Sequence, residues 1–207
     1  MDQLSLFGEA GQSRGLPSDL LEYIPGVFST LESKYLLDHF IGKVPWEQKI
    51  IKLYNKEIAT PRLTAWFGDP GTNYSFSGMA LDPLPWTSEL LMMKERVEAL
   101  AGTTFNSVLL NYYRHGNDSV AWHRDNERIL GRNPVIASVS LGQVRNFDIR
   151  LQADHSRKYS MRLEDGSYLL MKGDLQELWE HRIAKSTKPM KPRINLTFRR
   201  ILAPPVG

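Results

Sequence analysis

Two histidines and an aspartate stand at a spacing that could hold a divalent metal ion. His123 and Asp125 are separated by one residue, and His181 follows much later in the chain. Two imidazoles and one carboxylate bind one side of an Fe(II) ion and leave positions open for a co-substrate and dioxygen. On a strand, a His-x-Asp pair would point both side chains to the same face. The pair alone occurs by chance in many proteins, so its neighbours decide what it means.

A second polar set alternates with apolar residues near the end of the chain. Residues 193–199 read Arg-Ile-Asn-Leu-Thr-Phe-Arg, and on a strand Arg193, Asn195, Thr197 and Arg199 would share one face. A solvated edge of a sheet is one interpretation of such a face. The alternative is an inward face, because two guanidinium groups aimed at a metal pocket suit a dicarboxylate, which they bind in forked pairs.

Two further observations bear on the inward interpretation. Asn111 and Tyr113 share a face of an earlier strand-like segment and offer an amide and a phenol. The other histidines, His39, His115 and His155, have no partner at ligand spacing. We therefore expect these three to be structural or solvated.

Composition limits the class of protein. The 207 residues are 42% hydrophobic and 24% charged, with a net charge of +3 and no cysteine, which excludes disulfides and cysteine-ligated zinc. No apolar run approaches the roughly 18 residues that a membrane span needs, and the start lacks the basic region of a secretory signal. We expect a cytoplasmic protein without membrane contact. The mild positive charge permits a polyanionic partner without requiring one.

The pattern of elements predicts a mainly β fold with flanking helices. Capping-box spacing at Ser29 predicts a helix that ends near Gly42, and a second helix is expected from about Ser88 to Leu100. A hairpin is expected at 52–61. Short alternating segments dominate from Phe105 to Ile201, which favours a sandwich or barrel. The predicted division is a tail over 1–16, helices and a substrate lid over 17–103, and the catalytic β-domain over 104–203.

These motifs together resemble the AlkB-type Fe(II)/2-oxoglutarate dioxygenases, which dealkylate nucleobases. The resemblance covers roughly residues 45–202, and its C-terminal half is the specific part. It rests on the residues already described and on the segments Pro61-Arg62, Gly68-Asp69, Tyr74-Ser75-Phe76-Ser77-Gly78 and 136–142. It is greatest with the subgroup that acts on duplex DNA. The implied fold is a double-stranded β-helix, or jelly roll, with the metal inside one end.

The resemblance also implies a role for each polar residue. His123, Asp125 and His181 would bind Fe(II). Arg193, helped by Tyr113, would bind the distal carboxylate of 2-oxoglutarate, while Arg199, Asn111 and Thr197 would hold the end near the metal. Contacts to the substrate would come from the aromatic pair and the polar residues near the lid and the metal: Tyr74, Phe76, Ser77, Asn126 and Glu127.

The implied reaction is oxidative dealkylation of N-alkylated bases, of the 1-methyladenine and 3-methylcytosine type, in DNA repair. Dioxygen and 2-oxoglutarate would be consumed, and succinate, CO2 and an aldehyde released. The target base must leave the duplex to reach a buried metal, so it has to be flipped and stacked. Asn126 departs from the pattern, since relatives commonly carry an acidic residue there, and this leaves the base preference open.

Two further segments suggest contacts with other macromolecules. Leu53, Tyr54 and Asn55 form the predicted hairpin tip, where duplex-acting relatives carry an apolar finger that fills the gap left by a flipped base; packing on the protein is the alternative. Nearby Lys49 and Arg62 could meet phosphates. In the tail, the run Gln3, Leu4, Ser5, Leu6 and Phe7 resembles the peptide by which bacterial replication and repair proteins bind the sliding clamp.

Alternatives to this interpretation remain open. The same chemistry could act on RNA or on a protein side chain. A non-catalytic jelly-roll binding module is a second alternative, although the complete triad and both arginines count against it. A cupin-like zinc or manganese enzyme is a third, but it would not need the paired arginines. We expect a monomer.

Overall fold

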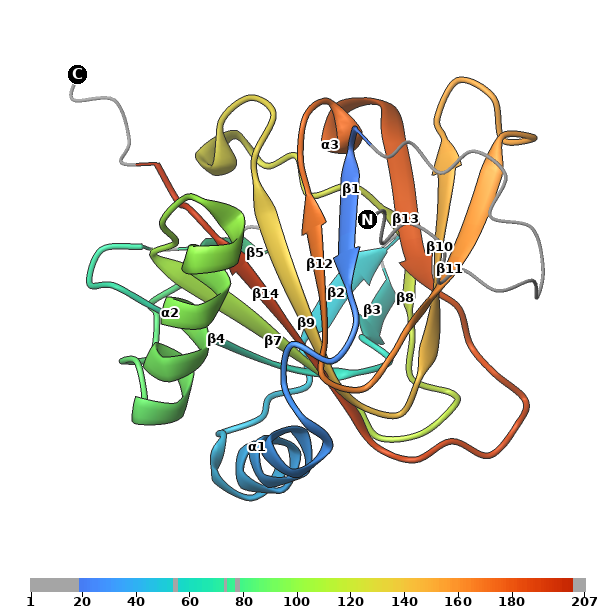
Figure 1. Cartoon of the computed structure of the whole chain (residues 1–207). Coiled ribbons are helices and arrows are strands. Elements are labelled where there is room, and N and C mark those ends of the chain that lie inside the picture. The colour runs from blue at the N-terminus through green and yellow to red at the C-terminus, as the bar shows by residue number, and fades with distance from the viewer. Residues whose placement is uncertain (1–18, 54–55, 73, 77–78, 203–207) are drawn as a thin grey trace, which may run out of the picture.

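The computed structural model describes residues 19–53, 56–72, 74–76 and 79–202 (Figure 1). For residues 51–53, 56, 74–76 and 79–81 it describes the backbone alone. Two antiparallel sheets form the body, and two helices pack on the outer face of the larger sheet. This arrangement is the mainly β jelly roll with flanking helices that the sequence predicts.

The larger sheet has six strands, and the strand at its centre carries the polar face described above. Their order is β1 (Leu21–Ile24), β12 (Ser167–Met171), β9 (Ile136–Gly142), β14 (Arg193–Arg199), β7 (Ser107–Tyr113) and β4 (Leu63–Gly68). Every neighbouring pair is antiparallel. Since β14 pairs with both β7 and β9, it is an inner strand of the sheet and neither of its edges is free.

The smaller sheet has four strands and brings the two candidate histidine ligands onto adjacent strands. Its order is β11 (Lys158–Leu163), β10 (Arg145–Leu151), β13 (Trp179–Ile183) and β8 (Val120–His123). Apolar side chains from both sheets, among them Phe147, Ile149, Ile136 and Leu169, form one buried cluster between them. The polar cavity described below shares this interior.

Helices α1 (Thr30–Lys43) and α2 (Ser88–Ala101) cover the outer face of the larger sheet, where their apolar side chains join a second buried cluster. Ser29 and Glu32 form the predicted capping box at the start of α1. Gly102, with φ of +64°, ends α2 where the sequence predicts. A short helix, α3 (Leu175–Leu178), and a 3-10 turn, η1 (Arg128–Leu130), connect strands.

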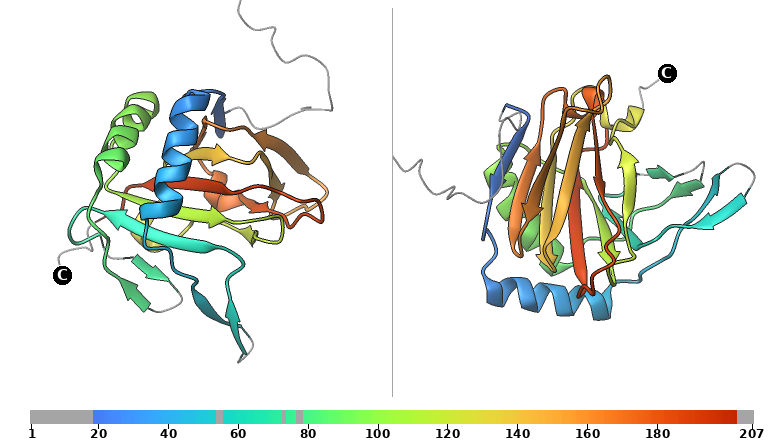
Figure 2. Two further views of the ribbon diagram at one scale, coloured as in Figure 1. Left: turned by 90° about the horizontal axis from the view of Figure 1, so that it is seen from below. Right: turned by 90° about the vertical axis from the view of Figure 1, so that its right-hand side faces the viewer.

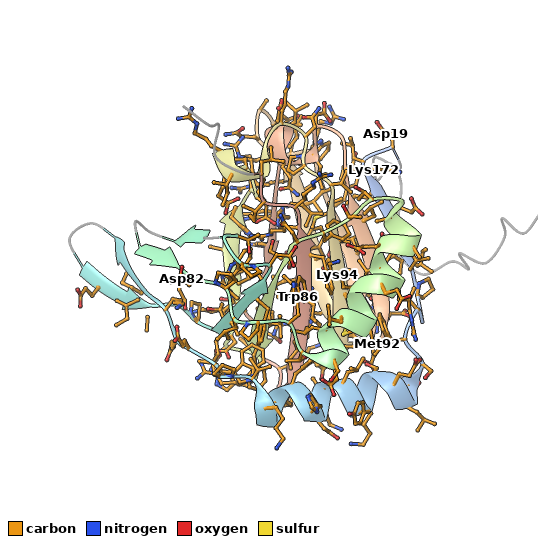
Figure 3. All side chains as sticks on the ribbon, turned by 90° about the vertical axis from the view of Figure 1, so that its left-hand side faces the viewer. Asp19, Asp82, Trp86, Met92, Lys94 and Lys172 are labelled. Carbon is orange, nitrogen blue, oxygen red and sulfur yellow. The ribbon has the colours of Figure 1, made fainter. Side chains whose placement is uncertain are left out.

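Polar contacts fix the two main helices to each other and to the body. Glu32 pairs with Arg96 at 2.9 Å, which joins α1 to α2. Just before α2, the Trp86 indole donates to Asp69 Oδ1 at 2.8 Å. Lys94 Nζ lies 5.8 Å from the centre of the Trp86 ring, and both side chains are labelled in Figure 3. The helical layer is therefore tied to the sheet by cations as well as by apolar packing.

Two small hairpins project from one side of the body (Figure 2). The first pairs β2 (Ile50–Leu53) with β3 (Lys56–Ala59), as the sequence predicts, and the second pairs β5 (Tyr74–Phe76) with β6 (Met79–Leu81). Neither is part of the two large sheets. Leu53 ends β2, whereas Tyr54 and Asn55 lie outside the described residues.

The expected boundary at residue 104 does not coincide with a structural division. Strands β1 and β4 precede that residue, yet they are the two outer strands of the larger sheet. The reason is that antiparallel pairing in this barrel joins segments far apart in the chain, which local patterns do not report. Among the described residues, no helix is long and apolar enough to span a membrane.

Gly166 links the start of α1 to the sheet, and its replacement should destabilise the fold. Its φ is +69°, the Phe28 N–H donates to its carbonyl at 3.0 Å, and an added Cβ would overlap the Phe28 carbonyl oxygen. Gly26→Ala is the matched control, because Gly26 has φ of +65° but open space around a Cβ. We expect the control to lower the unfolding free energy by about 1 kcal/mol and Gly166→Ala by more than about 2 kcal/mol in urea denaturation. Equal losses would contradict the packing argument.

Candidate active site

A cavity of about 340 Å³ opens between the two sheets. Its wall includes all eight residues that the sequence assigns to the metal and the co-substrate: Asn111, Tyr113, His123, Asp125, His181, Arg193, Thr197 and Arg199. These residues come from strands β7, β8, β13 and β14 and from the segment after β8. The fold thus brings the whole predicted set into one space.

The candidate metal ligands meet where β8 pairs with β13. His123 and His181 are direct partners in this antiparallel pair, and their ring centroids are 4.2 Å apart. One ligand atom from each of His123, Asp125 and His181 lies within 4.8 Å of the other two. Among the described residues, this is the one group of three or more such side chains that could hold a metal ion.

Both histidines are prepared to act as neutral ligands. The His123 Nδ1 lies 2.9 Å from the carbonyl oxygen of Ala121, and an Nδ1–H donated to that oxygen leaves Nε2 with a free lone pair. Burial is the largest cause that lowers the pKa of His181, to about 3. Its Nδ1 is buried and has no hydrogen-bond partner within the described part of the chain. A neutral imidazole is the form that binds metal.

Asp125 lies just beyond the end of β8, so it is not the strand residue that the His-x-Asp pattern suggested. Its backbone N–H donates to Gln176 Oε1 at 2.9 Å, which fixes the chain after the strand ends. Its carboxylate pairs with Arg199 at 2.9 Å. Burial opposes ionisation, but the charge of Arg199 and its hydrogen bond outweigh it and keep the pKa of Asp125 below its usual value. The third ligand is therefore an anion.

The polar face of β14 points into the cavity, so the solvated-edge interpretation is wrong. Arg193 and Arg199 are buried, and register places Arg193 beside Tyr113 and Asn195 beside Asn111 on β7. Serines on β9 accept from this face: Ser138 from Asn195 at 2.7 Å and Ser140 from Arg193 at 2.9 Å. The polar face of β14 therefore lines the cavity with hydrogen-bond donors that are held in fixed positions.

Arg193 is a buried cation with spare donors. Its side chain is 1% exposed, and burial lowers its pKa to about 10, so it stays charged at neutral pH. Within the described residues, Nε and Nη1 have no hydrogen-bond partner. A buried charge without a counter-ion is costly, and an anion in the cavity would relieve that cost. The donor set fits a carboxylate at this position.

The residues present therefore fit both groups that the chemistry requires. Two neutral imidazoles and one carboxylate match the ligand set of non-haem Fe(II). The positive charge and free donors at Arg193 match the far end of a dicarboxylate such as 2-oxoglutarate. Fe(II) would be held by His123, Asp125 and His181, and 2-oxoglutarate by the wall formed by β7 and β14.

Two supporting residues were not assigned to the site from the sequence. Arg62 donates through Nε to Asn111 Oδ1 at 2.7 Å and through Nη1 to the Ser119 carbonyl at 3.4 Å. Its guanidinium therefore holds a residue assigned to the co-substrate, and the expected contact with phosphate stays a prediction. The second is Gln176, which holds Asp125. Neither contact has a local sequence signal, because the partners are far apart in the chain.

The expected substrate residues divide into three groups. Glu127 lines the cavity, whereas Asn126 is exposed and does not line it. Tyr74 and Phe76 lie on β5, where only the backbone is described. Outside the described residues are Ser77, the hairpin tip residues Tyr54 and Asn55, and the tail residues Gln3, Leu4, Leu6 and Phe7. The roles expected for them remain predictions.

A second cavity, of about 190 Å³, adjoins the first. Arg62 and Leu109 line both. Its other wall residues include Lys49, Thr60 and Asp82, which flank the two small hairpins in sequence. The metal cavity is thus next to a space at the base of both hairpins.

The remaining histidines lie near carboxylates but outside the cavity, as expected. His39 is 3.5 Å from Glu89, and His155 is 3.9 Å from Glu180. His115 is 4.0 Å from Asp118, whose carboxylate is already paired with Arg114. Each makes a contact suited to a structural or solvated side chain.

Removal of either His123 or Asp125 should abolish metal binding. His123→Ala and Asp125→Ala each delete one of three ligands, and we expect affinity for Fe(II) to fall by more than about a hundredfold, since even loss of a supporting residue costs 10- to 100-fold. Anaerobic equilibrium dialysis against Fe(II) measures this directly. His155→Ala is the control and should bind like the wild type. Near-normal iron binding by Asp125→Ala would contradict the ligand assignment.

Comparison with known proteins gives similar sequences. The chain is 38% identical over 192 residues to "Alpha-ketoglutarate-dependent dioxygenase alkB homolog 3" of Homo sapiens, covering 88% of this chain and 66% of that protein. It is 36% identical over 183 residues to "DNA oxidative demethylase ALKBH2" of Homo sapiens, covering 85% and 68%. The chain thus spans about two thirds of the length of these relatives, and just under two thirds of the first.

Fold and family comparisons agree with the geometry. The solved structure of OsALKBH1 superposes with a TM-score of 0.64 at 16% identity and covers 87% of this chain and 97% of that one, which shows a shared fold. The family model of the 2OG-Fe(II) oxygenase superfamily matches residues 20–199, a range that includes every metal and co-substrate residue described above. The chain belongs to the 2OG-Fe(II) oxygenase superfamily.

Proposed function

We propose that this protein removes alkyl groups from N-alkylated bases in DNA by oxidation, a direct repair of lesions such as 1-methyladenine and 3-methylcytosine. The observation that carries the proposal is the pair of adjoining cavities. One holds the metal triad, and the other lies at the base of two hairpins. A nucleotide that enters between the hairpins would meet Arg62 and Leu109 before the metal.

Each residue has a defined part in this reaction. When bound, Fe(II) and 2-oxoglutarate supply the oxidation of the N-alkyl carbon by dioxygen, with succinate and CO2 as products. His123, Asp125 and His181 hold the metal, and Arg193 holds the distal carboxylate. Arg199, Asn111 and Thr197 orient the other end of the co-substrate.

The base would be held by aromatic and polar side chains at the entrance. Phe76 and Tyr74 supply flat apolar faces on which a flipped base can stack. Glu127 lines the cavity and offers a carboxylate to the base edge. Exposed Asn126 stands beside it. Leu53, Tyr54 and Asn55, the hairpin tip predicted from the sequence, would fill the gap that the flipped base leaves.

The name of one relative supports DNA as the substrate, and the predicted wedge supports a base-paired one. One relative, at 36% identity, is named a DNA oxidative demethylase. The predicted wedge at the hairpin tip has a use only where a flipped base leaves a stack. We also propose that the protein acts as a monomer, because one chain supplies all eight residues assigned to the metal and the co-substrate.

A panel of methylated oligonucleotides tests the substrate. Duplex DNA, single-stranded DNA and RNA carrying 1-methyladenine or 3-methylcytosine are incubated with the protein, Fe(II), 2-oxoglutarate and ascorbate, and the products are measured by mass spectrometry. We expect demethylation of DNA, and none by the His123→Ala variant because iron is lost. Preference for RNA would favour the same chemistry on the other nucleic acid. Absence of demethylation by wild-type protein that retains iron would overturn the proposal.

We also propose that the tail binds a bacterial sliding clamp through Gln3, Leu4, Leu6 and Phe7, in the cytoplasm. The support is the sequence of the run, with a glutamine first and a Leu-Phe pair last. A repair enzyme gains from such a tether, because attachment replaces a three-dimensional search by a high local concentration.

Fluorescence titration with purified clamp tests the tether. The variant with Leu6→Ala and Phe7→Ala should lose at least about tenfold in affinity, because two apolar anchors are removed. A variant with Asp2→Ala and Ser5→Ala, in the same tail, is the control and should bind like the wild type. Equal binding by the wild type and the Leu6, Phe7 variant would rule the tether out.

A further inference from the structure

A further arginine, Arg145, is buried behind the residues that line the co-substrate space, and the reaction described so far does not use it. Arg145 opens β10 and is 4% exposed. Its Nη2 donates to two backbone carbonyls, Asp118 at 3.0 Å and Ala184 at 2.6 Å. Within the described residues it forms no ion pair, and the nearby Asp118 carboxylate is already bound by Arg114 at 2.8 Å. Burial lowers the pKa of Arg145, and the nearby charge of Asp118 only partly offsets this, so the guanidinium has no carboxylate of its own among the described residues.

Arg145 and Arg193 lie against the same phenol ring. The guanidinium carbon of Arg145 is 5.7 Å from the centre of the Tyr113 ring, and that of Arg193 is 5.1 Å away. Both cations gain from contact with an aromatic ring, and together they restrict its orientation. Tyr113 lines the cavity, whereas Arg145 stands outside it. The ring thus links the co-substrate space to a cation that does not line it.

The two carbonyls that bind Arg145 belong to loops that close this end of the barrel. The Asp118 carbonyl lies in the turn after β7, and the Ala184 carbonyl follows β13. These loops also meet directly, because Ser186 N–H donates to the Gly116 carbonyl at 2.8 Å. A Cβ at Gly116 would lie 2.7 Å from the Ser186 carbonyl oxygen, so the contact leaves no spare room. Arg145 therefore joins both loops to Tyr113.

Two buried cations without carboxylate partners create a demand for an anion. Burial lowers the pKa of Arg193, and the positive charge of Arg145 lowers it further, which reflects repulsion between the two. A carboxylate placed on Arg193 would be attracted by both charges, since Coulomb interactions are strong in a poorly solvated interior. The second charge would therefore favour a ligand with a distal carboxylate over one without it.

We propose that Arg145 is a positioning residue that makes the co-substrate pocket selective for a dicarboxylate, by fixing the Tyr113 ring and adding a second positive charge behind Arg193. It acts on the distal carboxylate of 2-oxoglutarate without touching it. The inference rests on the co-substrate assignment made above and is independent of which nucleic acid is the substrate.

Ligand binding without turnover tests the proposal. Protein loaded with Mn(II), without dioxygen or nucleic acid, is titrated calorimetrically with 2-oxoglutarate and with 2-oxopentanoate, which carries a methyl in place of the distal carboxylate. For Arg145→Met we expect about tenfold weaker binding of 2-oxoglutarate. Binding of 2-oxopentanoate should change by less than about twofold. A loss that is equal for both acids would indicate a merely structural role and overturn the proposal.

Two further variants calibrate the measurement. Arg193→Met removes the direct partner of the distal carboxylate and should abolish most of the preference for 2-oxoglutarate. Arg150→Met, on the same strand as Arg145, removes a cation that pairs with Glu180 outside the cavity and should keep the wild-type preference. Loss of preference in Arg150→Met equal to that in Arg145→Met would assign the effect to net charge and overturn the proposal.

If Arg145→Met does not fold, Arg145→Lys keeps the charge but loses the fork that binds both carbonyls. It is measured in wild-type and Tyr113→Phe proteins. The lysine keeps the charge, so it tests the fixing of the ring, whose effect on the co-substrate would pass through the Tyr113 hydroxyl. It should therefore weaken 2-oxoglutarate binding in the first background and have little effect in the second, which lacks that hydroxyl. Equal effects in both would overturn the proposal.

The same titrations separate failure of the co-substrate assignment from failure of this inference. No preference of the wild type for 2-oxoglutarate over 2-oxopentanoate would overturn both. A preference that is unchanged in Arg145→Met would overturn this inference alone.

Discussion

The hydrogen-bond ladders on both edges of β14 are the constraint on which the site depends. The neighbours β7 and β9 hold this strand on either side, and residues of the smaller sheet face its polar side chains across the cavity, so the polar face forms part of the interior. Buried polar groups need partners, and here Ser138, Ser140 and Asp125 supply them. Among the described residues, the Nε and Nη1 atoms of Arg193 have no hydrogen-bond partner, so this side chain can bind an anion. As a result of the sheet topology, the segment Arg193–Arg199, in which polar and apolar residues alternate, forms one wall of a binding site.

Burial acts in opposite directions on the groups of this cavity, and the chemistry uses both. It keeps His181 neutral, which suits a metal ligand. It would also neutralise Asp125, but the adjacent Arg199 offsets this and keeps the carboxylate charged. For Arg193 there is no such counter-ion among the described residues, so its charge is left for a ligand. The same buried cavity thus contains a neutral ligand at His181, an anionic ligand at Asp125 and a cation at Arg193 that can bind an anion.

Much of this could be predicted from the sequence, because the signals are local. Alternation along 193–199, the capping box at Ser29 and the His-x-Asp pair each report on neighbours in the chain. The strand at 193–199, the helix start at Ser29 and the grouping of the three candidate ligands are as predicted, although Asp125 lies beyond the end of its strand. The contacts that support the site could not be predicted. Arg62 with Asn111, Gln176 with Asp125, and Arg145 with Tyr113 join distant segments, and nothing in either segment alone identifies its partner. The same reason explains why β1 and β4 were assigned outside the β-domain.

The two small hairpins are hydrogen-bonded within themselves and are not strands of either large sheet. Residues in them can therefore change without altering the register that holds the metal ligands. Natural variation should accumulate there at little cost in folding stability, while β7, β8, β13 and β14 stay the same. A lineage could in this way acquire a new lesion or a new nucleic acid as its target and retain its oxidation chemistry unchanged.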